Sequence, residues 1–196
     1  ITYLRLADSI SYGHIEEVLM KILFVMPKVG AWATHGIHRS PNQLYAHWAA
    51  YIRERGYADV AVIDGKADQI PMDQLVQMVK DKAPDVVVMG EQLHGYGGYG
   101  VLKHFKDAGV GIKKALPKVK IVLGGLWYSA MPVHTLENNP EVDFVVMGEE
   151  ESFGDLIEAI DKNKPLKDVG GVTSRVDGEI VMGPHKPLMQ DLDKLP

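Results

Sequence analysis

The chain has 196 residues, a formal net charge of −5 and a 46% share of hydrophobic residues, and it contains no cysteine. This length suffices for one well-buried domain with an appendage. The negative balance without a basic stripe argues against nucleic acid as a partner, and no apolar stretch approaches the roughly 20 residues of a membrane span. Without thiols, these residues cannot form disulfides or ligate an iron–sulfur cluster, and we expect a cytoplasmic protein.

Apolar runs of strand length alternate with helical patterns along the chain. Five runs have the continuous apolar character of strands that are buried on both faces: residues 21–26, 60–63, 86–89, 120–123 and 144–147. A helix is expected after each run. The first should have Ser40 as its N-cap and Pro41 at its first position, and it should end at Gly56. The other four are expected over residues 72–82, 101–107, 132–138 and 152–160.

Five strand–helix units in succession predict an α/β fold. The expected architecture is a flavodoxin-like five-stranded parallel sheet in the order 2-1-3-4-5, with helices on both faces. After these units, residues 171–175 and 179–182 flank Asp177-Gly178, which is a strong signal for a C-terminal β-hairpin. The proline-rich end that follows predicts an extended linker.

The pattern divides the chain into three parts. Residues 1–19 have no clear pattern, and they form an N-terminal extension that is open to interpretation as translated upstream sequence, because Met20 looks like a natural start. Residues 20–163 form the ligand-binding domain. Residues 164–196 form the hairpin and a linker toward another domain.

The expected ligand crevice lies at the carboxyl edge of the sheet. In the order 2-1-3-4-5 the topological switch point falls between strands one and three, and the two longest loops, residues 28–40 and 90–100, follow those strands. The fourth strand ends on Gly124-Gly125, and Gly148 follows the fifth. Glycine has no Cβ, so backbone or ligand can approach a strand end closely. We therefore expect an edge cleared for one large, flat ligand.

Other ligands fit the pattern less well. Residues 95–100 satisfy the dinucleotide-binding fingerprint, but they follow the third strand instead of the first, which favours a flexible glycine loop. A phospho-receiver domain needs acidic residues after strand one, where this chain has Met26-Pro27. FMN stays open, although an apolar and aromatic segment stands where its phosphate loop belongs.

The histidines offer one candidate metal ligand. His35 and His38 are three residues apart, but no third ligand has a recognisable spacing. Gln92, His94 and Gly97 have the spacing of the cobalamin motif Asp-x-His-x-x-Gly, with glutamine in place of the aspartate that orients the histidine. That motif normally follows strand one, so we interpret the match as a coincidence and keep His94 as the only candidate cobalt ligand.

The order of motifs resembles the cobalamin-binding domain of B12-dependent radical SAM enzymes, from about Met20 to Pro196. The segments that carry the resemblance are Val-Lys-Ile-Val-Leu-Gly-Gly at 119–125, Met-Pro at 131–132, Val-Asp-Phe-Val-Val-Met-Gly-Glu at 142–149, Asp-Gly-Glu-Ile at 177–180, Pro-Leu at 187–188 and Asp-Leu-Asp-Lys-Leu-Pro at 191–196. The chain departs from the family at Glu150, where a glycine is usual, and at Glu91-Gln92, where the loop usually begins with serine or threonine.

The resemblance implies a cobalamin-binding module that holds base-off cobalamin beside a catalytic domain following Pro196. That domain would carry SAM and a 4Fe-4S cluster, in a parent enzyme of methyltransferase or cyclase type, while this chain alone would be non-catalytic. The alternative is a free-standing carrier of a corrinoid or another small ligand. The expected cofactor contacts are Pro27, Lys28, Val29, Gly30, Trp32, Gly90, Glu91, Gln92, Leu93, His94, Gly95, Gly124, Gly125, Leu126, Trp127, Met147, Gly148 and Glu149.

Overall fold

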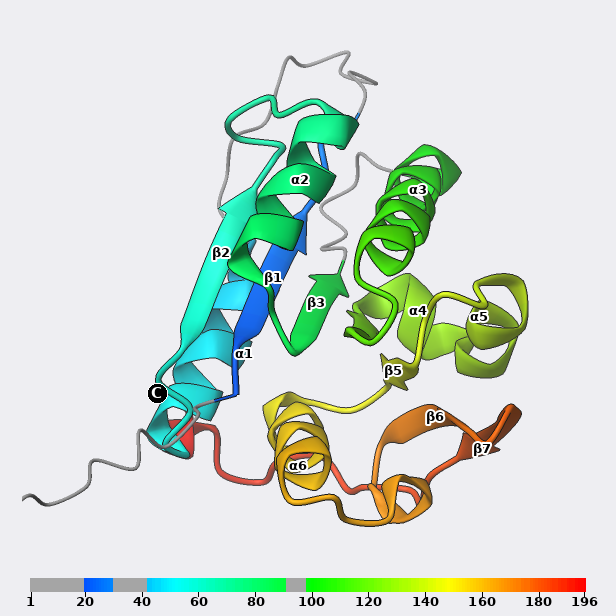
Figure 1. Ribbon diagram of the computed structural model, residues 1–196. Coiled ribbons are helices and arrows are strands. Elements are labelled where there is room, and N and C mark those ends of the chain that lie inside the picture. Colours follow the sequence, from blue (N-terminus) through cyan, green and yellow to red (C-terminus); the bar gives the residue numbers. More distant parts are fainter. Residues whose placement is uncertain (1–19, 30–41, 91–97) are drawn as a thin grey trace, which may run out of the picture.

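The computed structural model describes residues 20–29, 42–90 and 98–196, with residues 98–101 described by their backbone alone. One seven-stranded sheet organises this part of the chain (Figure 1). Its strands are β1 (Ile22–Met26), β2 (Val60–Asp64), β3 (Val86–Gly90), β4 (Lys120–Gly124), β5 (Phe144–Val146), β6 (Val172–Val176) and β7 (Glu179–Met182).

The strand order is β2-β1-β3-β4-β5-β6-β7, which confirms the predicted order of the first five. These five are parallel. The hairpin forms as predicted, with Asp177 at φ 51° and Gly178 at φ 87° in its turn. It is not a separate appendage, because β6 pairs antiparallel with β5, Phe144 facing Ser174, and so extends the same sheet. Main-chain hydrogen bonding along the free edge of β5 explains this placement.

Helices cover both faces of the sheet, as predicted. They are α1 (Gln43–Glu54), α2 (Met72–Lys82), α3 (Gly98–Ala115), α4 (Leu126–Ala130), α5 (Pro132–Asn138) and α6 (Glu150–Asp161). In Figure 1, α2 lies in front of the sheet and α1 behind it. Helices α1 and α6 pack together, with the rings of Trp48 and Phe153 stacked at 4.3 Å and 13°.

The first helix begins later than the sequence predicts. Its N-cap is Asn42, whose side chain accepts a hydrogen bond from the Tyr45 N–H at 3.4 Å, and the helix starts at Gln43. The predicted cap at Ser40-Pro41 is therefore wrong. Asparagine caps a helix as well as serine does, so the cap preference alone could not choose between the two positions.

One further helix differs from its predicted bounds, and one short helix was not predicted. The third extends to Ala115 instead of ending near residue 107, because Ala108 and Ile112 continue its buried stripe at helical spacing. A short helix, α4, precedes the predicted α5. It begins directly after Gly125, whose φ of +106° turns the chain out of β4.

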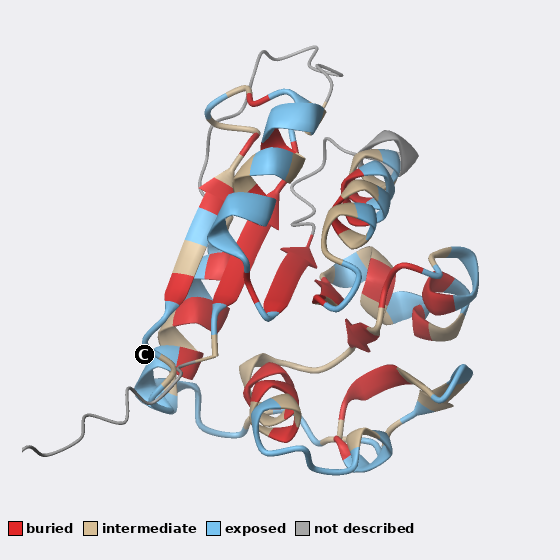
Figure 2. Cartoon of the chain, in the orientation of Figure 1, coloured by how far each residue is buried: buried red, intermediate tan, exposed pale blue. Residues whose placement is uncertain are grey.

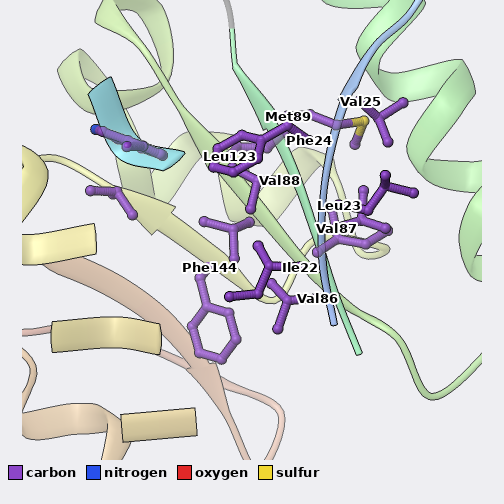
Figure 3. Packing of buried hydrophobic residues seen from close by; sticks show 14 of the residues in the cluster. Ile22, Leu23, Phe24, Val25, Val86, Val87, Val88, Met89, Leu123 and Phe144 are labelled. Carbon is purple, nitrogen blue, oxygen red and sulfur yellow. The ribbon is translucent and has the colours of Figure 1, made fainter. Parts of the chain in front are cut away.

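The core lies along the central strands. All five residues of β1 and of β3 are buried, as the red arrows of Figure 2 show. Their side chains pack against Leu123 of β4 and Phe144 of β5 (Figure 3). This apolar slab fixes the positions of the strand ends at which the site was predicted.

Candidate functional site

The N-terminal turn of α1 is hydrogen-bonded to the topological switch point. Strands β1 and β3 pair only as far as Phe24 and Val88. Beyond that point the Tyr45 hydroxyl bridges them: it donates to the Val25 carbonyl oxygen at 2.8 Å and accepts from the Gly90 N–H at 3.0 Å. These bonds satisfy backbone groups that the diverging strands leave unpaired.

Two further contacts hold Gly90. The Asn42 side-chain amide donates to the Gly90 carbonyl oxygen at 3.1 Å, and the Tyr45 hydroxyl lies 3.2 Å from the same oxygen. Burial raises the pKa of Tyr45, against the opposing effect of its hydrogen bond with Gly90. The phenol therefore stays neutral and keeps the proton that it donates.

The glycines at the strand ends give room to helix side chains. A Cβ on Gly90 would lie 2.8 Å from Leu44 Cδ2 and 3.0 Å from the Gly124 carbonyl oxygen. A Cβ on Gly124 would overlap the Trp48 indole, and a Cβ on Gly148 would overlap the Ser152 hydroxyl. Each missing side chain thus admits a group from α1 or α6.

The space beside Gly124 is occupied by a side chain of α1. The absent side chain of Gly124 was expected to leave free space for a ligand, but the outer ring of the Trp48 indole takes that space. Its Cζ3 and Cζ2 atoms would lie 3.0 and 3.2 Å from a Cβ at this position, and Trp48 is 2% exposed. The glycine is required by close helix packing, which produces the same sequence signal as a ligand slot.

Several other predicted contact residues border the same edge. Pro27, Lys28 and Val29 follow β1, and they are buried, exposed and half-buried in that order. Leu126, directly after Gly125, is 65% exposed. It presents an apolar side chain to solvent at the carboxyl end of β4. Trp127 follows it and is half-buried.

The residues that directly follow β5 are hydrogen-bonded to residues at the start of β6. The backbone N–H groups of Met147 and Gly148 both donate to the Gly171 carbonyl oxygen, at 2.8 and 3.1 Å. The Met147 sulfur accepts from the Thr173 hydroxyl at 3.3 Å. These interactions join β5 to the start of β6, so the main chain of Met147 is already engaged.

Glu149 binds the C-terminal segment. It is the N-cap of α6, yet its side chain makes no capping bond. Its Oε2 atom accepts from the Met189 N–H at 2.7 Å. Further along α6, Asp155 pairs with both Lys186 of the same segment and Arg55 at the end of α1. The segment is thereby held along α6.

The remaining predicted contacts, Gly30, Trp32 and residues 91–95, lie outside the described residues, and so does the candidate ligand His94. Their roles stay predictions. Within the described ranges, no group of three or more histidine, cysteine, aspartate or glutamate side chains could hold a metal ion. Nor is any helix there both long and apolar enough to cross a membrane.

The sequence analysis missed Asn42 and Tyr45 as parts of this edge. Leu44 and Trp48 recur at helical spacing, which is typical of the buried face of a helix. Tyr45 lies on that face too, but a tyrosine there is ordinary core packing by pattern alone. Its hydroxyl partners belong to β1 and β3, and no spacing within the chain indicates them.

Comparison with known families identifies the class of protein that this fold and edge define. A family model described as the B12 binding domain matches residues 45–157, which is more than half of the chain and runs from α1 into α6. The chain belongs to the B12-binding domain family.

Two curated relatives cover nearly the whole chain. An uncharacterized methyltransferase of Pyrococcus horikoshii is 29% identical over 181 residues, which are 91% of this chain and 38% of the relative. The anaerobic magnesium-protoporphyrin IX monomethyl ester cyclase of Rubrivivax gelatinosus is 27% identical over 181 residues, 90% of this chain and 32% of the relative. The chain thus spans well under half of the length of either relative.

Solved structures show the same fold. The radical SAM methyltransferase TsrM of Kitasatospora setae, with cobalamin and a [4Fe-4S] cluster bound, superposes with a TM-score of 0.70 at 17% identity, over 91% of this chain and 31% of that one. The cobalamin-dependent radical SAM enzyme OxsB, with aqua-cobalamin and S-adenosylmethionine bound, gives 0.65 at 19% identity, over 87% and 23%. The flavodoxin-like arrangement predicted from the sequence is that of these domains.

The described part of the edge fits cobalamin unequally. Leu126 and Met131, 65% and 42% exposed, supply apolar surface of the kind that a corrin covers. The space beside Gly124, which the sequence analysis expects to be clear for a ligand, is filled by Trp48. The exposed apolar side chains could therefore meet a corrin without rearrangement, whereas a group that entered the space beside Gly124 would have to displace the indole.

Proposed function

We propose that this chain holds cobalamin at the carboxyl edge of its sheet, next to a radical SAM catalytic domain. The observation that carries the proposal is the B12 binding domain match over residues 45–157, because it spans α1, the glycine ends of β3 and β4, and the start of α6. The names of the two curated relatives, a methyltransferase and a cyclase, support a parent enzyme of one of these types.

In this proposal the role of the chain is to bind and orient cobalamin. Cobalt chemistry belongs to the cofactor when it is bound. Pro27, Val29 and Leu126 would contact the corrin, and the nucleotide tail of base-off cobalamin would run toward Gly124-Gly125. These apolar contacts would orient the ring and exclude water from it. His94, the candidate from the sequence, would be the residue to ligate cobalt.

The catalytic partner must contribute what this chain lacks. A thiolate-held iron–sulfur cluster needs cysteines, and the 196 residues contain none. SAM and the 4Fe-4S cluster would therefore be bound by a domain after Pro196, and this chain alone would be non-catalytic. The lack of cysteine also agrees with a cytoplasmic location, and the net charge of −5 supports a partner other than nucleic acid.

Retention of hydroxocobalamin on gel filtration, followed by the visible spectrum of the protein fraction, tests the proposal. The spectrum also distinguishes base-on from base-off cofactor. We expect retention by the wild-type chain and a loss of affinity of about tenfold or more for Leu126→Asp, because an unpaired carboxylate would be buried under the corrin.

Val110→Asp is the matched control. Val110 is an aliphatic residue of α3 that is 49% exposed, and it is distant in sequence from the strand ends. A wild-type chain that retains no corrinoid would refute the proposed function. Equal retention by the Leu126→Asp and Val110→Asp variants would refute the placement at the carboxyl edge.

A further inference from the structure

We infer that Trp48 is a specificity-determining residue that opposes binding of a nucleotide tail. The indole occupies the space beside Gly124. In the proposed placement the tail of cobalamin would need this space, so it could enter only when the indole leaves. The inference rests on the proposed function, and it concerns which corrinoids the edge accepts.

The indole is held in place by its neighbours. It lies between α1 and the sheet, with its outer ring over Gly124 and its face stacked on Phe153 of α6 at 4.3 Å. An aromatic pair in this geometry is stabilising beyond the burial of its area. Moving the indole therefore costs free energy, which subtracts from the binding of any ligand that requires the move.

Withdrawal of the whole helix α1 is the less accessible route. Its first turn is fixed to Gly90 by the Asn42 amide at 3.1 Å and the Tyr45 hydroxyl at 3.0 Å, and Leu44 packs on the same glycine. Moving α1 would break these buried bonds together, whereas a rotation of Trp48 breaks none of them. The structure thus assigns the barrier to one side chain.

The position of Trp48 should affect the binding of the corrin ring and of the nucleotide tail differently. In the proposed placement the corrin ring would rest on the strand ends and on the side chains around Leu126, outside the space that the indole fills. The tail would compete with the indole directly. Apparent affinity falls in proportion to the fraction of molecules in the competent conformation, so Trp48 lowers the affinity for a tailed corrinoid alone.

Dicyanocobalamin and dicyanocobinamide provide the test, because they share the corrin and both axial ligands and differ in the nucleotide tail. The dissociation constant of each is measured with the full chain and with Trp48→Leu, which removes the ring over Gly124. We expect the affinity for dicyanocobalamin to rise about fivefold, since a stacked aromatic pair is worth on the order of 1 kcal/mol and 1.4 kcal/mol corresponds to a factor of ten. The affinity for dicyanocobinamide should stay unchanged.

Two further variants keep the test decisive. Trp48→Phe retains an aromatic ring while losing the outer atoms over Gly124, and it serves where Trp48→Leu fails to fold. Phe105→Leu is the control for a general loss of core packing, because Phe105 is equally buried but belongs to α3 and packs edge-on against Tyr128 of α4. It should leave the ratio of the two affinities unchanged.

The outcomes separate the inference from the proposed function. A ratio that the Trp48 variants leave unchanged, or lower, overturns the inference while the proposed function stands. A wild-type chain that binds neither corrinoid overturns the proposed function and the inference with it. A ratio that rises in the Trp48 variants but not in Phe105→Leu supports the inference.

Discussion

Removal of the Tyr45 hydroxyl should destabilise the fold far more than the loss of one oxygen atom suggests. Tyr45→Phe deletes the bond to the Val25 carbonyl at 2.8 Å and leaves the Gly90 N–H, 3.0 Å from the hydroxyl, without that partner in a buried position. One lost bond costs about 1 kcal/mol and a stranded buried donor about 1–3 kcal/mol. We expect the free energy of unfolding to fall by about 2–3 kcal/mol, or the melting temperature by about 4–12 °C.

Urea denaturation of the wild-type chain and of Tyr45→Phe measures this difference. Tyr57→Phe is the matched control, because the Tyr57 hydroxyl bonds an exposed partner, Asp161, at 3.3 Å, and its loss should cost at most about 0.5 kcal/mol. A cost for Tyr45→Phe no larger than that for Tyr57→Phe would refute the reasoning, since it would mean that Gly90 finds another partner without strain.

Alkaline pH adds an independent check on Tyr45. Burial raises the pKa of its phenol above the ordinary value of 10.0. The raised pKa contributes stability that is fully present below pH 10.0 and declines as the pH rises above it, because the unfolded chain can then lose a proton that the folded chain keeps. The difference in stability between the wild-type chain and Tyr45→Phe should therefore narrow above pH 10.0. A gap that stays constant would show that the hydroxyl is not buried in solution.

Three other variants test separate features. Gly124→Ala should lower the free energy of unfolding by about 1–3 kcal/mol, because the added methyl group overlaps the indole. Combining it with Trp48→Leu should recover part of this loss. If urea denaturation shows that the costs of the two substitutions simply add, the overlap is contradicted. Hydrogen bonds from Lys164, which has the larger effect, and from Lys162 lower the pKa of Glu158 to about 2. The stability that the ionised carboxylate contributes to the folded chain is therefore present above pH 4.5 and is lost as the pH falls toward 2. The melting temperatures of the wild-type chain and Glu158→Gln should thus converge over that range, and parallel curves would argue against the pairing. Glu149→Ala should release the segment around Met189 and speed its cleavage by thermolysin, with Glu179→Ala as control; equal rates would contradict the tether.

The strands and their order could be predicted well from the sequence, because continuous apolar runs are local and strong signals. Fully buried parallel strands need continuous apolar runs, and β1, β3 and β4 have them. Asp177-Gly178 is suited to two successive positive φ angles, so the hairpin was predictable as well. That the hairpin joins the main sheet depends on the free edge of β5, which no residue of the hairpin indicates.

The candidate site was only partly predictable, for a physical reason. Helical periodicity shows which face of α1 is buried, but it does not show how far the helix sits along the sheet. That translation decides whether Trp48 lies over Gly124 or away from it. A glycine at a strand end signals a close approach without identifying the approaching group, so a ligand slot and a packed indole give the same pattern.

The hydrogen bond between Glu149 and Met189 limits how far the C-terminal segment can extend from α6. Seven residues separate Met189 from Pro196, and a fully extended chain spans at most about 3.6 Å per residue, so Pro196 cannot lie much beyond 25 Å from the Glu149 carboxylate. A catalytic domain attached to this segment, as proposed above, would be present at an effective concentration in the millimolar range. Two sites linked in this way can meet repeatedly without a large interface between them. The carboxylate at the start of α6 would therefore govern how often they meet.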